Sequence, residues 1–389
     1  MGKCPVCESE SLEGFLHRSG VPVHQNLIFD SEAEACSCAR GELEMIVCAA
    51  CGFVFNRAFD AAKLAYGAHY DNTQSYSPAF DDYLDSLIET LVQQKGVKNK
   101  TIVEVGCGKG VFLRKLVAYP SGGNRGFGFD PSYVGPLLEL DGRLQFRQSF
   151  YDQSCDNIAA DFVVSRHVIE HVSDPLALLR QIHGAIGHNG AAMVFFETPC
   201  VDWILRNRVF WDFFYEHCSL FSRHSLALAF ERSGFFVTSV SHLFGGQYLW
   251  MEAGSRRRQP GSYDAGNETL ALARQFAAAE AEIRHNWIAR LDELRQHAAI
   301  AFWGAGAKGA TLANLVDPAR TRVDCLVDIN PNKQGKFIPG TGHPIVSPQA
   351  LGERGIDTII LMNPNYRREV ETILRANGLA VDLIDGWAA

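Results

Sequence analysis

Hydrophobic and polar positions follow the same order in two distant parts of the chain. At 101–105 a β-rich apolar run leads into the glycine-rich sequence GCGKG at 106–110, and an amphipathic run follows. At 299–303 a second apolar run leads into GAGAKG at 304–309 and then into ATLANL. Strand, glycine loop and helix in this order are typical of nucleotide-binding α/β units. The pattern therefore predicts two Rossmann-like units in one chain.

Other periodic segments supply the remaining elements. Apolar residues at helical spacing predict a helix over 81–94, and a long charged segment predicts a connecting helix over 269–294. The polar, tyrosine-rich segment 66–83 lacks clear periodicity and is either a linker or a lid. Buried strands are expected at 161–165, 193–199, 325–327 and 358–362.

Composition narrows the classes of protein that this can be. The chain has 389 residues, 47% hydrophobic and 21% charged, as in an ordinary globular protein. The net charge of −8 argues against binding along a nucleic-acid backbone. No run reaches the roughly 18 apolar residues that span a bilayer, and MGKCPVCESE lacks the apolar core of a signal peptide. We therefore expect a cytoplasmic protein with no membrane or nucleic-acid partner and with reduced cysteines.

Two CxxC pairs have the spacing of a metal site. The candidate metal ligands are Cys4, Cys7, Cys48 and Cys51. Four sulfurs at the corners of a tetrahedron suit a structural Zn²⁺ ion and leave no position for a substrate. Gly52 follows the second pair, where a tight turn needs a residue that tolerates positive φ. The alternatives are core cysteines without metal, or a ligand set that includes Cys36 and Cys38.

The first glycine loop carries acids at both of its sides. The sequence EVGCGKG has the form E-x-G-x-G-x-G, which resembles the first motif of class I S-adenosylmethionine-dependent methyltransferases. Asp130 lies twenty positions beyond the last loop glycine, at the end of the next strand, where a carboxylate can accept hydrogen bonds from ribose hydroxyls. The predicted cofactor contacts are Glu104, Gly106, Gly108, Gly110, Asp130, Ser165 and Arg166.

Histidines and an acid follow the later strands of this unit. Glu216 and His217 stand side by side in FYEHCSLFS, either as solvated side chains at a turn or as a general base and its helper at a pocket. His167 and His171 are four residues apart, so on a helical turn they would share one face. A metal pair is conceivable there, but no third ligand is evident. A structural turn is the plainer interpretation of this segment.

The second glycine loop matches G-x-G-x-x-G and leaves three interpretations open. It can bind a nicotinamide dinucleotide, it can bind the diphosphate of a substrate with help from a lysine, or its glycines can only permit close packing. Asp328 closes the strand that follows. The candidate substrate contacts are Gly304, Gly306, Lys308 and Asn363.

Taken in order, these blocks resemble one family along nearly the whole chain. The CxxC pairs, EVGCGKG, YEHCSLFS, and the tail from IAFWGAGAKGATLANL through DINPNKQGKFIPGTGHPIVSP are similar to those of the nucleotide-sugar C-methyltransferases of deoxysugar biosynthesis. The resemblance implies an α/β protein with a zinc-binding domain and lid at 1–75 and a class I methyltransferase domain at 76–255. A connecting helix at 256–297 and a smaller Rossmann-like domain for the sugar nucleotide at 298–389 complete it.

The same resemblance implies a chemistry. The family acts on a 4-keto sugar linked to a nucleoside diphosphate: a base removes the acidified C3 proton, and the enolate carbon attacks the methyl group of S-adenosylmethionine. By resemblance His217 is the base and Glu216 its partner, while His171 matches a pocket histidine. Tyr70 or Tyr76 falls where the family brings an N-terminal tyrosine over the site. An imidazole with an ordinary pKa of about 6.5 can take a proton near neutrality.

One position departs from the family. Relatives often carry a tyrosine two residues before the glutamate, where this chain has Phe214, and Tyr215 directly precedes the glutamate instead. Adjacent side chains in an extended segment point in opposite directions. Either a local shift brings Tyr215 into the role, or Tyr70 or Tyr76 takes it, or the reaction differs.

Other functions stay open at this point. The chain can be an O- or N-methyltransferase on another sugar or small molecule, an NAD-dependent sugar oxidoreductase that uses the 304–309 loop, or a zinc-ribbon binding protein. The expected partner is a small-molecule nucleotide sugar. The sequence leaves the oligomeric state open, a monomer included.

Overall fold

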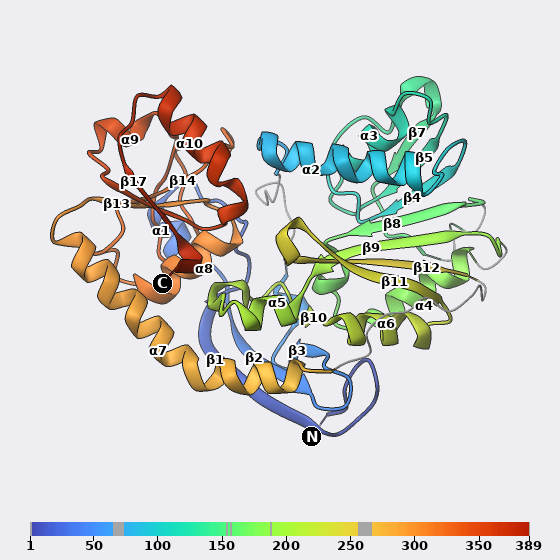
Figure 1. The fold of residues 1–389 in the computed structure, drawn as a ribbon, viewed down its shortest axis with the longest axis horizontal. Coiled ribbons are helices and arrows are strands. Elements are labelled where there is room, and N and C mark those ends of the chain that lie inside the picture. Colours follow the sequence, from blue (N-terminus) through green and yellow to red (C-terminus); the bar gives the residue numbers. More distant parts are fainter. Residues whose placement is uncertain are drawn as a thin grey trace.

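Three β-sheets organise the chain (Figure 1). The computed structural model describes residues 2–388 apart from 65–73, 153–154, 156–157, 187–188 and 256–266. The first sheet is antiparallel, with strand order β1-β2-β3-β10. Its strands are β1 (Leu12–Pro22), β2 (Arg40–Cys48), β3 (Val54–Asn56) and β10 (Ser219–Leu220). The last of these comes from the middle of the sequence, which local patterns did not predict.

The second sheet has eight strands in the order β11-β12-β9-β8-β4-β5-β7-β6. Strands β9, β8, β4, β5 and β7 are parallel, and β12 runs antiparallel between β9 and β11. The strands are β4 (Thr101–Val105), β5 (Arg125–Phe129), β6 (Leu138–Glu139), β7 (Leu144–Arg147), β8 (Phe162–Arg166), β9 (Met193–Pro199), β11 (Phe236–Leu243) and β12 (Tyr248–Gly254). The predicted strands at 101–105, 161–165 and 193–199 are thereby confirmed.

Helices cover both faces of this sheet because its strands are apolar on both faces. Ile102 packs into the cluster under α2 and α3, whereas Val103 packs into the cluster under α4 and α6. The helices are α2 (Pro78–Glu89), α3 (Val111–Ala118), α4 (Pro175–Ile186) and α6 (Arg223–Arg232). Helix α2 begins earlier than predicted because the Ser77 hydroxyl accepts a hydrogen bond from the Phe80 amide and Pro78 occupies the first turn. The linker or lid expected there is therefore a helix from residue 78 onward, and residues 65–73 lie outside the described residues.

The third sheet is parallel throughout, with the order β15-β14-β13-β16-β17. Its strands are β13 (Ile300–Trp303), β14 (Cys325–Val327), β15 (Ile345–Val346), β16 (Thr358–Leu361) and β17 (Asp382–Asp385). Phe302 packs with α7 (Thr269–Arg295) and α8 (Ala307–Val316) on one face. Trp303 packs with α9 (Ala350–Glu353) and α10 (Arg367–Ala376) on the other. The predicted second Rossmann-like unit and the connecting helix are both present.

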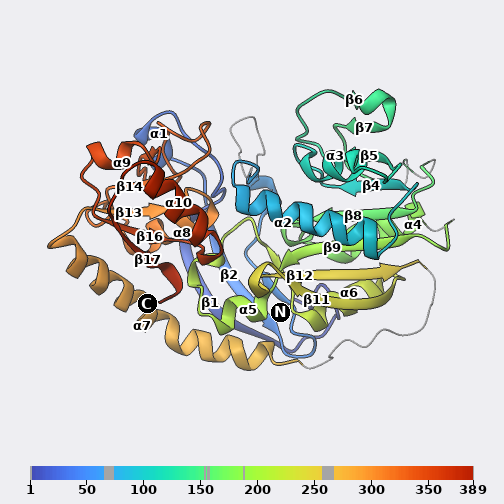
Figure 2. The same cartoon turned by 45° about the horizontal axis from the view of Figure 1, so that its top comes forward.

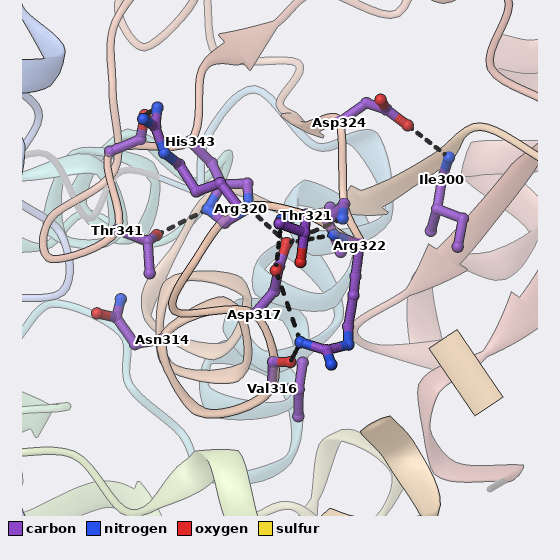
Figure 3. A network of polar contacts seen from close by, with 12 residues as sticks. Ile300, Asn314, Val316, Asp317, Arg320, Thr321, Arg322, Asp324, Thr341 and His343 are labelled. Atoms are coloured by element: carbon purple, nitrogen blue, oxygen red, sulfur yellow. Dashed lines mark hydrogen bonds and ion pairs between the residues drawn. The ribbon is translucent and has the colours of Figure 1, made fainter. Parts of the chain in front are cut away.

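A buried polar network closes the end of α8 (Figure 3). The Asp317 carboxylate accepts hydrogen bonds from the amides of Thr321 and Val323, at 2.8 and 2.9 Å. His343 Nε2 lies 3.0 Å from Asp317 Oδ2, and His343 Nδ1 lies 2.7 Å from Thr341 Oγ1. Burial alone would raise the pKa of Asp317, but His343 and the backbone amides outweigh it and lower that pKa. All three side chains are buried and satisfied, so the network holds the fold together rather than forming a site.

The N-terminal domain joins the two α/β units. In Figures 1 and 2, β1 and β2 extend from beside the central sheet toward the C-terminal sheet, with α7 along their outer side. The buried Arg18 guanidinium of β1 donates to the Phe210 carbonyl and to Glu280 Oε1 of α7, both at 2.9 Å. Phe29 pairs with Phe337 of the C-terminal domain. In the part of the chain that is described, no helix combines the length and apolar character needed to cross a membrane.

Candidate active site

The first glycine loop gives a ligand close access to the backbone. Gly106, Gly108 and Gly110 have φ values of 71°, 53° and 73°, a left-handed conformation that side chains rarely adopt. A Cβ atom on Gly106 would lie 2.2 Å from Val168 Cγ2, whereas one on Gly108 would meet no atom of the described residues within 4 Å. The loop therefore turns sharply at the carboxyl end of β4 and leaves open space above Gly108.

The acids beside this loop have different surroundings. Glu104 is buried, and burial raises its pKa to about 8. Its Oε2 atom has no hydrogen-bond partner among the described residues. Asp130 accepts hydrogen bonds from the Gly108 amide and from the Ser132 amide, each at 2.8 Å. An orphaned buried carboxylate oxygen beside an open glycine loop suits a ligand that brings hydrogen-bond donors, as S-adenosylmethionine does.

A charged network lies at the ends of β8 and β9, and the sequence analysis singled out Arg166 and His167 in it but missed Glu197 and Tyr83. Arg166 donates to Glu197 Oε1 at 3.1 Å and stacks 4.8 Å from the centre of the Phe112 ring. The Tyr83 hydroxyl donates to Glu197 at 2.7 Å, and His167 Nε2 lies 2.7 Å from the same carboxylate. Burial alone would raise the pKa of Glu197. The positive charges and hydrogen bonds of Arg166 and His167 outweigh burial and lower that pKa to about 2. In the sequence, the available signal for Glu197 was an acid near the end of a buried strand.

Two other residues of this edge have structural contacts. The Ser165 hydroxyl donates to the Val105 carbonyl at 2.8 Å, so it links β8 to β4. Burial acts to lower the pKa of His167, but its hydrogen bonds with Glu170 and Glu197 outweigh burial and raise that pKa to about 9. His167 has a left-handed φ of 54° and precedes a single 3₁₀ turn. The expected helical face shared by His167 and His171 is therefore wrong.

His171 contacts His217 instead. The two imidazole rings meet edge to face with their centres 4.8 Å apart, and the Phe214 ring lies 4.1 Å from that of His217. Burial lowers the pKa of His217 well below its ordinary range, and the neighbouring His171 adds to that shift. An imidazole that stays neutral can accept a proton. The structure thus brings together two of the predicted pocket histidines, from segments more than forty residues apart.

Glu216 faces the other way. Its side chain is fully buried and forms a hydrogen bond with His24 Nδ1. The backbone amide of Gln25 donates a second hydrogen bond to Glu216 Oε2 at 3.4 Å. Neither His24 nor Gln25 was singled out in the sequence, because no local signal pairs the N-terminal domain with residue 216. Among the described contacts, the acid therefore fixes the segment before His217 to the N-terminal domain and forms no bond to the His217 ring.

The candidate substrate residues line the contact between the central and C-terminal domains. Lys308, the second residue of α8, forms an ion pair with the buried Asp212. Asn363 and Gln247 are both buried and exchange side-chain hydrogen bonds of 3.1 and 3.3 Å. Asp212 and Gln247 were missed by the sequence analysis, since each acquires its partner only from the other domain.

The second glycine loop is tighter than the first. Gly304 has a φ of 115°, whereas Gly306 is extended at −98°. A Cβ atom on Gly309 would lie 2.0 Å from the Gly304 carbonyl oxygen. The Asp328 carboxylate accepts a hydrogen bond from the Ala305 amide at 3.1 Å and lies 3.7 Å from the buried Lys333 ammonium. The loop therefore packs against itself, and the acid that follows it is engaged within the domain.

The tyrosine candidates are separated by the structure. The Tyr215 hydroxyl accepts a hydrogen bond from the Asp60 amide at 2.8 Å, which holds this side chain in the N-terminal domain. Tyr76 is 42% exposed and its hydroxyl lies 3.4 Å from Asn332 Nδ2 of the C-terminal domain. Tyr70 lies outside the described residues.

The four CxxC cysteines converge. Cys4 Sγ lies 3.7 Å from Cys51 Sγ, and Cys7 Sγ lies 3.5 Å from Cys48 Sγ. All four sulfur atoms lie within 4.8 Å of one another. Gly52 has the expected positive φ, 73°. Cys36 and Cys38 do not belong to this cluster.

Comparisons with known proteins agree with this geometry. Residues 78–240 match the family model of a methyltransferase domain, and residues 262–378 match that of a C-methyltransferase C-terminal domain. With the glycine loop and acids above, they establish the chain as an S-adenosylmethionine-dependent methyltransferase. It is similar to the C-methyltransferase NovU of Streptomyces niveus, with 25% identity over 396 residues that cover 95% of this chain and 91% of NovU. The predicted resemblance to C-methyltransferases is thereby confirmed along nearly the whole chain.

Two solved structures are similar over less than half of this chain each. An S-adenosylmethionine-dependent methyltransferase from Mesorhizobium loti has 16% identity and a TM-score of 0.32, over 44% of this chain and 99% of that chain. The dimethyltransferase RosA from Streptomyces davawensis has 18% identity and a TM-score of 0.36, over 45% of this chain and 54% of that chain.

Proposed function

We propose that this methyltransferase acts on a carbon atom, C3, of a 4-keto-deoxysugar linked to a nucleoside diphosphate. The observation that carries the proposal is the contact between the half-buried His171 and His217 rings, near the carboxyl edge of the methyltransferase sheet. The similarity to a C-methyltransferase along 95% of the chain supports transfer to carbon. The C-terminal domain that accompanies it matches a domain of C-methyltransferases.

Residues at the carboxyl edge of the sheet would hold the cofactor. The open loop contains Gly106, Gly108 and Gly110. Glu104 and Asp130 lie beside this loop, and Arg166 lies at the end of the neighbouring strand β8. When bound, S-adenosylmethionine supplies an electrophilic methyl group. The Ser165 hydroxyl is already used between two strands, so we expect it to position the edge rather than to contact the cofactor.

His217 carries the proton chemistry in this proposal. The 4-keto group acidifies the neighbouring C3–H bond, and the neutral imidazole takes that proton and leaves an enolate. The pKa of His217 is lowered by burial, which keeps the imidazole unprotonated near neutrality. His171 stands beside it as a donor toward the charge that develops on O4. Glu216 contributes by holding the chain segment through His24 rather than by polarising the imidazole.

The C-terminal domain is proposed to grip the nucleotide carrier. Lys308 lies at the start of α8 and pairs with Asp212, and a diphosphate at this helix start would take the place of that carboxylate beside the ammonium. Gly304 and Gly306 have no side chains and so would let the diphosphate approach the loop backbone. Asn363 lies at the contact with the central domain. The engaged Asp328 carboxylate disfavours a nicotinamide dinucleotide, which would need that acid for its ribose.

The four-cysteine cluster is proposed to hold a structural zinc ion. Zn–S bonds of about 2.3 Å place the sulfurs of a tetrahedral site about 3.8 Å apart. The distances of 3.5 and 3.7 Å agree with that value. The ion would fix the turns that carry the two CxxC pairs and would take no part in the reaction.

Deuterium exchange tests the proposed reaction without methyl transfer. In D₂O and without S-adenosylmethionine, the wild-type enzyme is expected to exchange the C3 proton of a dTDP-4-keto-deoxysugar, as followed by NMR. His217→Gln should slow this exchange on the order of 100-fold or more. His285→Gln, an exposed histidine on α7, is the matched control and should exchange normally. Methylation of an oxygen or nitrogen atom without C3 exchange would overturn the proposal and favour the O- or N-methyltransferase alternative.

A further inference from the structure

We propose that Glu170, His171 and His217 form a binding site for a divalent transition-metal ion, separate from the four-cysteine cluster. An ion bound there would block proton abstraction by His217. The first statement stands on geometry alone. The second rests on the proposed function, because it requires His217 to be the base.

The three side chains come from two turns that the tertiary structure brings together. Glu170 and His171 belong to the 3₁₀ turn after β8, and His217 belongs to the segment before β10. One potential ligand atom from each lies within 4.8 Å of those of the other two. Ligand atoms about 2.1 Å from a tetrahedral ion are about 3.4 Å apart, so small ring rotations complete the set.

The donor atoms are available for an ion. His171 Nδ1 is buried and has no hydrogen-bond partner among the described residues. A buried, unpartnered imidazole nitrogen is costly unless it meets a donor or a cation. Within the described part of the chain, each Glu170 oxygen accepts one hydrogen bond, Oε1 from His167 at 3.2 Å and Oε2 from the Thr198 hydroxyl at 3.1 Å. A carboxylate offers about four lone pairs, so positions toward the imidazoles remain.

The surroundings resemble those of a built metal site. Carboxylate ligands in metalloproteins are themselves oriented by hydrogen bonds, as His167 and Thr198 orient Glu170 here. Two imidazoles and one carboxylate favour Zn²⁺, Co²⁺ or a similar first-row divalent ion over Mg²⁺ or Ca²⁺. Three protein ligands would leave at least one position for water or substrate.

His217 cannot bind the metal ion and take the C3 proton at the same time. A neutral imidazole has one nitrogen with a free lone pair. The same lone pair serves either to bind the ion or to take the C3 proton. The ion would therefore compete with catalysis at this residue, and its removal would restore the base.

A cobalt titration tests binding without measuring activity. The enzyme is first loaded with one equivalent of Zn²⁺, which the four thiolates take up, and is then titrated with Co²⁺. We expect one further equivalent to give visible d–d bands without the intense near-ultraviolet thiolate band of a sulfur site. His171→Asn should weaken this binding at least 10-fold, and the exposed control His285→Gln should not change it.

Two results would overturn the site. One is the absence of d–d bands when Co²⁺ is added to wild-type protein whose sulfur cluster already holds Zn²⁺. The other is an unchanged titration in His171→Asn. Thermal unfolding of both variants checks that the fold is intact, and Glu170→Gln, which keeps the shape of the side chain, gives a second test should His171→Asn fail to fold.

The inhibitory effect is tested by C3 deuterium exchange. Exchange by the wild-type enzyme should be lost when Zn²⁺ or Co²⁺ fills the site and should return on mild chelation, whereas Glu170→Gln, which changes a ligand outside the proposed catalytic groups, should keep its own exchange rate when the ion is added. Full exchange by the ion-bound wild-type enzyme would overturn the inhibition. Absence of exchange in the ion-free enzyme would overturn the proposed function and the inhibition together, while the absorbance titration would still decide whether the site exists.

Discussion

The side chains of two neighbouring residues, Glu216 and His217, contact different domains. The glutamate is fully buried against His24 of the N-terminal domain, and the histidine lies against His171 of the methyltransferase domain. The chain turns here, with the His217 backbone amide donating to the Phe214 carbonyl at 3.2 Å, and the two adjacent side chains contact different domains. The position of the proposed base thus depends on a residue that lies outside its pocket.

Substitution of His24 tests this dependence. His24→Ala would leave the Glu216 carboxylate buried without its partner, so we expect the free energy of unfolding to fall by about 3 kcal/mol. Turnover should fall with it, because the segment that carries His217 loses its anchor. Chemical denaturation and C3 exchange measure the two effects. His17→Ala removes a side chain that is 64% exposed, so it should change stability by less than about 1 kcal/mol. Equal stability of the two variants would contradict the anchoring role.

At the scale of elements, the two glycine loops look alike in sequence but differ in purpose. The loop after β4 has three left-handed glycines and open space above Gly108. The loop after β13 brings Gly309 of α8 against the carbonyl of Gly304, at a distance that excludes any side chain. Of the three interpretations of this second loop, close packing accounts for Gly309, and the proposed diphosphate site uses the start of the helix.

Gly309→Ala tests the packing role. The new methyl group would lie 2.0 Å from the Gly304 oxygen and would push α8 away from β13. We expect a loss of about 1–3 kcal/mol in the stability of the C-terminal domain, measured by urea unfolding. Binding of S-adenosylmethionine should persist, because its loop belongs to the other sheet. In the control Gly352→Ala, on α9, the closest atom is a leucine methyl at 3.3 Å, and little change is expected.

At the scale of the whole molecule, the N-terminal domain supports the chain segment that carries the proposed base. Strand β10 begins two residues after His217 and pairs with β3, which begins three residues after Cys51. Because one sheet connects the cysteine cluster to His217, disorder around the cluster would disturb the position of the proposed base.

Removal of the proposed zinc ion tests this connection. Cys48→Ser, or removal of the four-cysteine ion from the wild-type protein by a strong chelator, should lower C3 exchange at least 10-fold, because β3 loses its support. Affinity for S-adenosylmethionine should change little, since the β4 loop lies in another sheet, and calorimetry can measure it. The control is Cys36→Ser, an exposed cysteine outside the cluster, which should retain activity. Full exchange by a metal-free Cys48→Ser protein would contradict the proposal.

Local patterns determined much of the architecture. The strand predicted at 101–105 is β4 with the same bounds, and the helix predicted from residue 269 is α7. The cysteine spacing indicated the four-sulfur cluster, and the glycine loop with its acids indicated the cofactor edge. These features are local in sequence, because hydrophobic period, turn chemistry and ligand spacing act over a few residues.

The tertiary structure decided which chemical groups meet. The sequence offered His167 and His171 as a pair without a third ligand, but a left-handed residue breaks the helical spacing, and His217 becomes the neighbour of His171. His24 reaches Glu216 across 192 positions, and Lys308 reaches Asp212 across 96. No pattern along the chain reports such pairs, because they arise when the three sheets and their helices pack together and carry their polar residues into contact.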